Sequence, residues 1–205
     1  AGIVAALAGG AVDPSLVDLR RVATAPARLR RVGAMVARAM GQASMALLLD
    51  SIGEKSVDEL WRLTDRLRQY TTTFVEAMDR EGVDALVCPA YATPALPHGG
   101  SKGFTLASSY SMVFNVTQFP AGVVPVTRVL AAETGSRGTA NRDRLFVQAA
   151  EVDAASVGLP VGVQVVGRPW KDDAVLALMA AIESDLSSDE SYPRTPVEPV
   201  ADRAA

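Results

Sequence analysis

The clearest pattern of hydrophobic and polar positions predicts a long amphipathic helix in the first half of the chain. Ser56 and Glu59 have the spacing of a capping box, which satisfies free backbone N–H groups at a helix start. Gly82 suits the left-handed position that follows many helices. Between them, apolar residues recur every three or four positions while polar residues face away. The apolar stripe consists of Leu60, Leu63, Leu67, Tyr70, Phe74 and Met78.

Three other runs have the patterning of β-strands. Val83–Cys88 is a short apolar run ended by Pro89, as expected for a buried strand. The run FPAGVVPVTRV, which begins at Phe119, carries proline near both ends, and Gly158–Gly167 alternates with a period of two. Helices are predicted between and after these strands, at Thr105–Gln118, Leu145–Ala155 and Asp172–Leu186.

This order of elements predicts an α/β fold in which a mixed β-sheet is flanked by helices. The domain is expected to span residues 1–186. Within it, residues 131–144 are polar and contain glycine, which predicts an exposed insertion. Residues 187–205 carry three prolines among polar residues, which predicts a disordered tail.

The segment 19–49 predicts a basic amphipathic helix. It contains six arginines and no acidic residue. Its apolar positions, spaced by three or four, are Leu29, Val32, Val36, Met40, Ala43 and Leu47. Basic helices with an apolar face bind anionic membranes, so contact with a membrane surface is one interpretation and a solvated basic face is the other. The arginines that would make that contact are Arg28, Arg30, Arg31 and Arg38.

Composition excludes several classes of protein. The 205 residues are 49% hydrophobic and 21% charged, which is a globular balance rather than a disordered one. A net charge of −3 argues against a dedicated nucleic-acid binder. No apolar stretch reaches the ~18–20 residues of a membrane span, and a single cysteine is compatible with the cytoplasm, so a cytoplasmic location is expected.

The most suggestive short motif is the glycine-rich segment Gly99–Gly103, which contains Ser101 and Lys102. Glycine-rich loops can present backbone N–H groups to phosphate. A phosphate loop, however, has wider glycine spacing and directly joins a strand to a helix, whereas Pro94 and Pro97 intervene here. An ordinary turn is therefore the favoured interpretation, and neighbouring residues such as Ser101 and Lys102 rarely form a catalytic dyad.

No other group of residues predicts catalysis. The single histidine, His98, lies in the same loop without a serine and carboxylate context, and Cys88 ends a buried strand as a small core residue. Lys55, Lys102 and Lys171 lie in polar or glycine-containing surroundings that would not lower a lysine pKa. The sequence thus indicates no catalytic residue, no metal site and no cofactor within this chain.

Several motifs together resemble one known family. These are DELWRL at 58–63, DALVCPAYATPAL at 84–96, FTLASSYSMVFNVTQFPAGVVPV at 104–126 and SVGLPVGVQVVGRPWKDD at 156–173. They are similar to the C-terminal portion of the amidase signature family, and within it to the fatty acid amide hydrolase-like branch. The similarity extends from about Ser56 to Leu186 and is weaker over residues 1–55.

The resemblance implies hydrolysis of carboxylic amides, including fatty acyl amides, by a lysine and two serines. Those three residues lie N-terminal to the matched region and have no counterpart here. In this branch the matched helix lines the acyl channel, at positions corresponding to Thr105, Ser108 and Met112, and Leu48 falls near another channel position. The basic segment corresponds loosely to a membrane-binding cap, although this chain has no aromatic residue between Ala1 and Asp50.

Three functions follow as hypotheses. The first is the substrate-channel portion of an amidase acting on a small-molecule amide, with no catalytic residue of its own. The second is a non-catalytic module that binds anionic membranes or partners through residues 20–49. The third is a phosphate-binding domain that uses Gly99–Gly103. The sequence leaves open which amide is cleaved and the oligomeric state.

Overall fold

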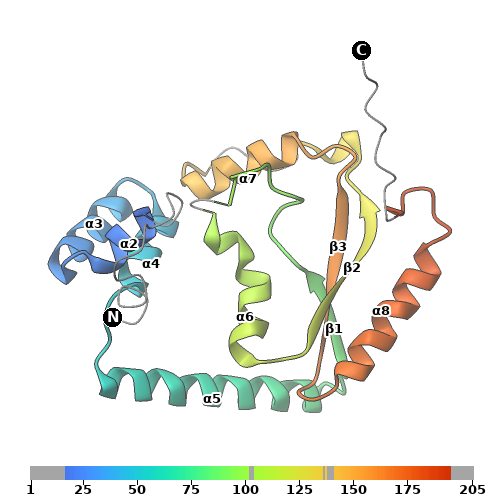
Figure 1. The fold of residues 1–205 in the computed structure, drawn as a ribbon, viewed down its shortest axis with the longest axis horizontal. Helices are drawn as coiled ribbons and strands as arrows, with labels where there is room; N and C mark the ends of the chain where they lie inside the picture. Colours follow the sequence, from blue (N-terminus) through green and yellow to red (C-terminus); the bar gives the residue numbers. More distant parts are fainter. Residues whose placement is uncertain (1–16, 102–103, 136, 138–140, 195–205) are drawn as a thin grey trace, which may run out of the picture.

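A computed structural model describes residues 17–101, 104–135, 137 and 141–194 of the chain. Figure 1 shows a central sheet with helices around it and a separate group of helices at the N-terminal side. The α-helices are α2 (Val17–Thr24), α3 (Ala27–Ala39), α4 (Ala43–Ser51), α5 (Val57–Arg80), α6 (Ser109–Thr117), α7 (Arg144–Ala154) and α8 (Asp172–Leu186). The strands are β1 (Ala85–Pro89), β2 (Ala121–Arg128) and β3 (Pro160–Gly167), and the 3₁₀ turns are η2 (Thr105–Ser108) and η3 (Ala131–Glu133).

The sheet places β3 in the centre, between β1 and β2. Both pairings are antiparallel, with Val87 opposite Val165 and Val123 opposite Gln164. The predicted α/β fold with flanking helices is confirmed, and the described strands form an antiparallel sheet. The register of β2 shifts between Pro125 and Thr127, since proline has no N–H to donate to the ladder.

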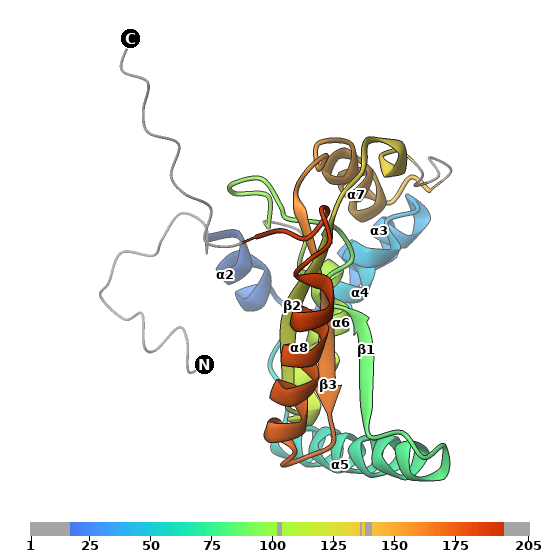
Figure 2. The ribbon, with the colours of Figure 1, turned by 90° about the vertical axis from the view of Figure 1, so that its right-hand side faces the viewer.

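Helices pack on both faces of this sheet, and successive residues of β3 contribute buried side chains to opposite faces. On one face, Val165 and Val124 pack against Val175 of α8. On the other, Val166 packs with Phe114 of α6, Phe119 and the last turns of α5. Figure 2 shows α8 running along the sheet, with α5 crossing its end. The central strand is therefore the most buried part of the molecule.

Helix α5 begins and ends where the sequence predicts. The hydroxyl of Ser56 accepts a hydrogen bond from the backbone N–H of Glu59 at 3.1 Å. Gly82 follows Glu81, the C-cap residue of α5, and has a φ of +64°, a conformation that favours glycine. Only the second half of the apolar stripe is buried, around Phe74 and Met78. The first half is exposed to solvent, with 57% of Leu60 accessible.

The basic segment is helical, but it forms three helices rather than the single one predicted. Pro26 separates α2 from α3, because proline lacks the N–H that a helix interior requires. Gly41, with a φ of +73°, ends α3 and turns the chain into α4. Helices α3 and α4, called the α3–α4 hairpin below, pack on each other through Ala34, Ala37, Ala46 and Leu49.

Two segments predicted to be exposed or disordered contribute buried side chains. Asp143, within the predicted insertion 131–144, is only 4% accessible. Tyr192 and Pro193 are buried in the turns that follow α8, within the predicted tail 187–205, and the Tyr192 hydroxyl donates to Glu183 at 3.3 Å. Residues 136, 138–140 and 195–205 of these segments lie outside the described part of the chain.

Candidate functional site

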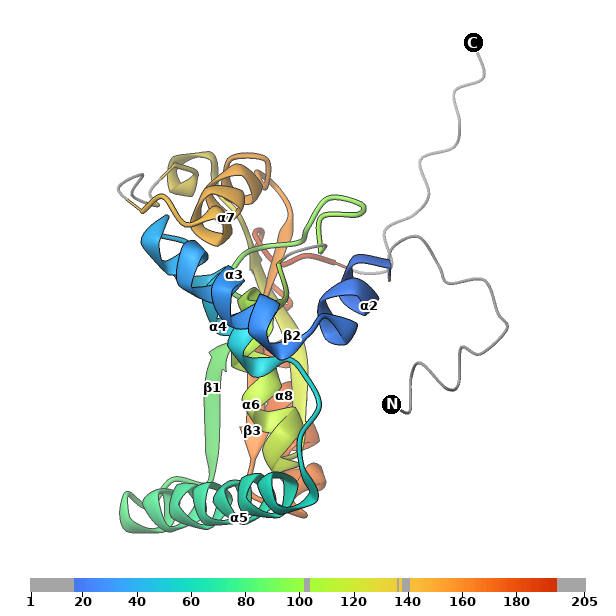
Figure 3. The same cartoon turned by 90° about the vertical axis from the view of Figure 1, so that its left-hand side faces the viewer.

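A cleft of about 400 Å³ lies between the α3–α4 hairpin and the starts of η2 and α7. Figure 3 shows the hairpin beside α7, on the side of the molecule away from α8. Segments far apart in sequence therefore form the two walls. The lining residues of the hairpin wall are Gly33, Val36, Ala37, Met40, Gln42, Ser44, Met45, Leu48 and Leu49, and those of the opposite wall are Thr105, Leu106, Asp143, Arg144 and Leu145.

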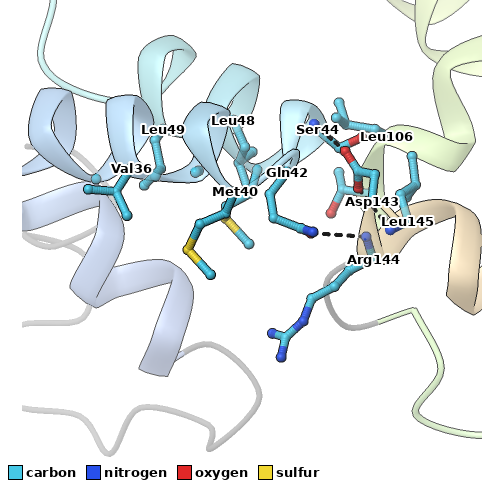
Figure 4. Close-up of a pocket in the computed structure, with 14 residues that line it drawn as sticks. Val36, Met40, Gln42, Ser44, Leu48, Leu49, Leu106, Asp143, Arg144 and Leu145 are labelled. Carbon is cyan, nitrogen blue, oxygen red and sulfur yellow. Dashed lines mark hydrogen bonds between the residues drawn. The ribbon is translucent and has the colours of Figure 1, made fainter. Parts of the chain in front are cut away.

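Most of the cleft is apolar. Figure 4 shows Val36, Met40, Leu48 and Leu49 on the two hairpin helices, with Leu106 and Leu145 across from them. Helices α3 and α4 reach this position because their alanines let the two backbones pack closely, which turns the larger residues outward. Methionine adapts its shape to different apolar ligands. The walls therefore suit a flexible hydrocarbon group.

The polar rim of the cleft is built around the carboxylate of Asp143. One oxygen accepts a hydrogen bond from the backbone N–H of Leu145 at 3.0 Å, at the start of α7. The other accepts from the backbone N–H of Ser44 at 2.8 Å, at the start of α4. Burial raises the pKa of Asp143, but hydrogen bonds from Ser44, Leu145 and Ala43 outweigh it and hold the pKa below its ordinary value of 3.8.

A second side chain on the rim, Gln42, joins the same two helices. Its amide nitrogen donates to the carbonyl of Arg142 at 2.9 Å, and its amide oxygen accepts from the backbone N–H of Arg144 at 3.0 Å. The first N–H groups of a helix have no partner within the helix. Gln42 therefore satisfies one such group of α7 from across the cleft, as Figure 4 shows.

The structure places two of the four predicted channel residues in this cleft. Leu48 of α4 and Thr105 of η2 both line it, although 57 positions separate them in the sequence. Ser108 and Met112 do not line it. The Ser108 hydroxyl donates to the Thr105 carbonyl at 2.6 Å, and Met112 lies further along on α6 with 40% of its surface exposed.

Sequence reasoning missed the rim residues and several wall residues. Asp143 precedes the apolar run that begins at Leu145, which is the signal of a helix N-cap. That signal could have identified Asp143 as the start of α7. It could not have shown that Asp143 also contacts Ser44, because the two residues are 99 positions apart.

A second, wider hollow of about 640 Å³ lies at the end of β1. It is lined by the loop 89–96 together with Ser101, Val123 and residues 160–162. Tyr91 is held in this loop by a hydrogen bond from its hydroxyl to the Phe104 carbonyl at 3.2 Å, and burial raises the pKa of Tyr91. Most of the residues that line this hollow are apolar.

The described part of the glycine-rich segment, residues 99–101, lies in a turn, as the favoured interpretation predicts. The backbone N–H of Gly100 donates to the Pro97 carbonyl at 2.8 Å, and His98 is exposed. Lys102 and Gly103 lie outside the described residues. Of the other lysines, Lys171 is exposed and Lys55 lies 4.0 Å from Glu59. Over the described ranges, His, Cys, Asp and Glu form no group of three that could hold a metal ion.

The four arginines proposed for membrane contact fall into two pairs. Arg38 forms an ion pair with Asp50, and the Arg30 guanidinium donates to the Ala25 carbonyl. Arg28 and Arg31 are exposed, and within the part of the chain that the structure describes neither side chain forms a hydrogen bond or ion pair. Among the described helices, none is both long and apolar enough to cross a membrane.

Comparisons with known proteins agree on one family. The sequence profile described as Amidase matches residues 21–176. Fatty-acid amide hydrolase 1 of Sus scrofa is 31% identical over 181 residues, which cover 85% of this chain and 30% of that protein. Fatty acid amide hydrolase 1 of Caenorhabditis elegans is 30% identical over 141 residues, covering 68% of this chain and 24% of that protein.

The fold is also found in a solved structure described as a fatty acid amide hydrolase. The two structures superpose with a TM-score of 0.55 and 20% sequence identity, over 80% of this chain and 32% of that one. The acetamidase of Emericella nidulans is a further relative, 27% identical over 147 residues, which cover 64% of this chain and 25% of that protein. The chain thus spans about a quarter to a third of the length of the relatives it matches.

Proposed function

Because this chain belongs to the amidase family, we propose that it forms the C-terminal, substrate-channel portion of an amidase that hydrolyses carboxylic amides, including fatty acyl amides. In this proposal the lysine and two serines of the Ser-Ser-Lys mechanism lie outside the chain. The chain supplies the binding surface for the acyl group, without a cofactor. We propose that it works in the cytoplasm, with peripheral membrane contact as a secondary feature.

The observation that carries this proposal is the apolar cleft between the α3–α4 hairpin and α7. Leu48 and Thr105 both line it, and the family resemblance implies a place in or near an acyl channel for both positions. Its volume of about 400 Å³ lies within the range of small-molecule sites, ~300–1,000 Å³. Its polar groups are confined to one rim, which matches an amide that carries a long apolar chain.

Chain length gives the sharpest test of an apolar cleft. Burial of each methylene group contributes ~0.8 kcal/mol, equivalent to roughly fourfold in affinity. The affinity of the 205-residue chain for linear primary amides should therefore rise with each added carbon until the cleft is filled. A fluorescent long-chain fatty acid would be displaced by the series, and the displacement gives each Kd.

Leu48→Trp should fill the cleft and weaken binding of long amides by at least tenfold, with little effect on short ones. Leu176→Trp on α8 is the matched control, since Leu176 is exposed and lies outside the cleft. If both variants bind the whole series as the unmodified chain does, the cleft is not the acyl site. Affinity that is independent of chain length would also contradict the proposal.

A separate experiment tests the proposal that the catalytic lysine and serines lie outside this chain. Amide hydrolysis requires an activated nucleophile and an oxyanion site. The 205-residue chain should therefore not react with a serine-directed fluorophosphonate and should show no amide turnover above background. Labelling of one serine at full stoichiometry would show that the chain contains an active site. Ser101, in the glycine-rich turn, would be the first serine to replace.

A second function is favoured by the outer surface of α3. Leu29, Val32 and Met35 are exposed there, next to the exposed Arg28 and Arg31. Near an anionic bilayer each arginine contributes ~1 kcal/mol. Co-sedimentation with vesicles should therefore rise with anionic lipid content and fall with salt. Replacement of both arginines by glutamate should abolish it, whereas the same change at Arg66 and Arg68 on α5 should not.

A further inference from the structure

Gln42 and Asp143 make a reciprocal contact between two helix starts that are distant in the sequence. Asp143 precedes α7 but also accepts a hydrogen bond from Ser44 of α4 at 2.8 Å. Gln42 precedes α4 but bonds across the cleft to Arg142 and Arg144 at 2.9 and 3.0 Å. Gln42 therefore satisfies backbone groups at the start of α7, which Asp143 precedes. Asp143 in turn satisfies a backbone N–H at the start of α4, which Gln42 precedes.

This contact is the main polar attachment of the α3–α4 hairpin to α7. The hairpin has its own small core of three buried alanines, Ala34, Ala37 and Ala46, with Leu49 packed against them. Its extensive packing is internal, between α3 and α4. Across the cleft the two walls face each other with apolar side chains, while the hydrogen bonds of Gln42 and Asp143 lie at the rim.

The Asp143 contact is preorganised on the α7 side. The backbone N–H of Asp143 itself donates to the Asn141 side chain at 3.0 Å, which orients the residue before α7 begins. The carboxylate is buried, and both of its oxygens have a backbone partner. A buried carboxylate that lost one of these partners would be unfavourable, so the contact is either fully made or fully broken.

We propose that Gln42 and Asp143 act together as a latch that holds the α3–α4 hairpin against α7 and sets the width of the cleft. They are positioning residues: they determine the distance between the walls and need not touch a ligand's acyl chain. When the latch is broken, the hairpin keeps its alanine core but moves as a unit, and the cleft accepts bulkier ligands. The ligand part of this inference rests on the proposed function, whereas the hairpin part does not.

Amide hydrogen exchange of the 205-residue chain tests the hairpin part. Asp143→Ala and Gln42→Ala should each raise exchange about tenfold across residues 27–51, including α3, to which neither side chain is hydrogen-bonded. Exchange in α8 should stay unchanged. Asp172→Ala and Gln69→Ala are the matched controls, since both residues are exposed and lie outside the cleft. Gln42→Ala alone suffices if Asp143→Ala fails to fold.

Two further measurements separate a latch from two independent helix caps. The double variant should exchange no faster than the faster single variant, because each change already breaks the same unit. An increase confined to residues 43–46 and 144–147, or effects that multiply in the double variant, would overturn the proposal. Gln42→Glu, which keeps the acceptor for Arg144 but loses the donor to Arg142, should have an intermediate effect.

Ligand selectivity tests the ligand part of the inference, namely that the latch sets the width of the cleft. Latch variants should bind a straight-chain fatty amide several-fold more weakly and a branched one at least as well as the unmodified chain. Faster hairpin exchange in a chain that binds neither amide would support the latch and contradict the proposed function. Unchanged selectivity in variants with a loosened hairpin would overturn the claim that the latch sets the width of the cleft.

Discussion

Two regions of the molecule are stabilised in different ways. One is the sheet with the helices around it, called the larger body below, and the other is the α3–α4 hairpin. In the larger body, large side chains pack on both faces of β3. On one face Phe74, Phe114 and Phe119 pack edge to face or tilted, with ring centroids 5.3–6.4 Å apart. In the hairpin, the buried residues are alanines, and hydrogen bonds at the cleft rim join it to the rest. The sheet is thus stabilised by apolar burial, and the position of the hairpin by a few polar contacts.

This difference has a functional consequence. A wall held by a few hydrogen bonds can move with a smaller free-energy change than one built into a core, and binding surfaces are commonly drawn from such low-stability regions. The cleft lies between one wall of each kind, because Leu106 and Leu145 belong to the larger body and Leu48 to the hairpin. Four predictions, ordered from the largest expected effect to the smallest, test the comparison.

Phe119→Ala should have the largest effect. Phe119 is buried in the cluster of Met78, Phe114 and Val166, and truncation of a buried phenylalanine costs ~3–5 kcal/mol. The free energy of unfolding from urea titration should fall by that amount. Phe146→Ala is the control, since Phe146 is largely exposed on α7. Equal losses for the two variants would mean that the aromatic cluster does not stabilise the body.

Ala34→Leu should disrupt the hairpin but spare the sheet. Ala34 is completely buried between α3 and α4, and overpacking a close contact costs ~1–3 kcal/mol. Hydrogen exchange should increase in residues 27–51 and remain unchanged in β3. Ala39→Leu, at an exposed position of the same helix, should change neither. Destabilisation of β3 by Ala34→Leu would show that the two regions unfold together.

The third test uses pH. The folded-state pKa of Asp143 is lowered, so its stabilising contribution is present above the ordinary carboxyl pKa and is lost as pH falls through the folded value. The chain should therefore be more stable than Asp143→Asn near neutral pH, by about 1 kcal/mol. The difference should shrink below about pH 4. Thermal unfolding from pH 7 to pH 2.5 measures it, and a difference that does not shrink toward the acid end would contradict the assignment.

The smallest effects should come from two ion pairs, one in each region. Asp50 pairs with Arg38 on the hairpin surface, where both side chains are exposed and solvent screens the pair. Asp50→Asn should cost less than about 1 kcal/mol. Asp153 pairs with Arg137 at 2.6 Å in a less exposed site, and Arg137 also donates to the Ala92 carbonyl at 3.0 Å. Asp153→Asn should cost more than Asp50→Asn, up to about 1 kcal/mol, and the reverse order would contradict the comparison.

Local signals predicted the elements of the larger body. The Ser56–Glu59 cap and Gly82 delimit α5 as expected, and β3 lies within the predicted strand Gly158–Gly167. Helix α8 occupies the predicted range, Asp172–Leu186. These outcomes follow from interactions within a few residues, namely capping, turn conformation and side-chain period. The family motifs predicted the membership that the comparisons establish.

Burial was the property that local patterns predicted least well. The stripe on α5 has one period from Leu60 to Met78, yet only its second half meets the sheet, because a pattern shows which face is apolar and not what covers it. The regular spacing through the basic segment likewise concealed the breaks at Pro26 and Gly41. The candidate site shows the same limit, since Leu48 and Thr105 share a cleft that Met112 does not line.

By itself, then, the sequence determined which segments are helices and strands, and which family the chain resembles. Only the tertiary structure decided that one carboxylate, Asp143, joins the starts of α4 and α7, and that Gln42 completes the contact. The physical reason is range: caps and periodicities depend on neighbours along the chain, whereas these hydrogen bonds join residues about 100 positions apart. Such contacts form only after the elements have packed, and they leave no local pattern in the sequence.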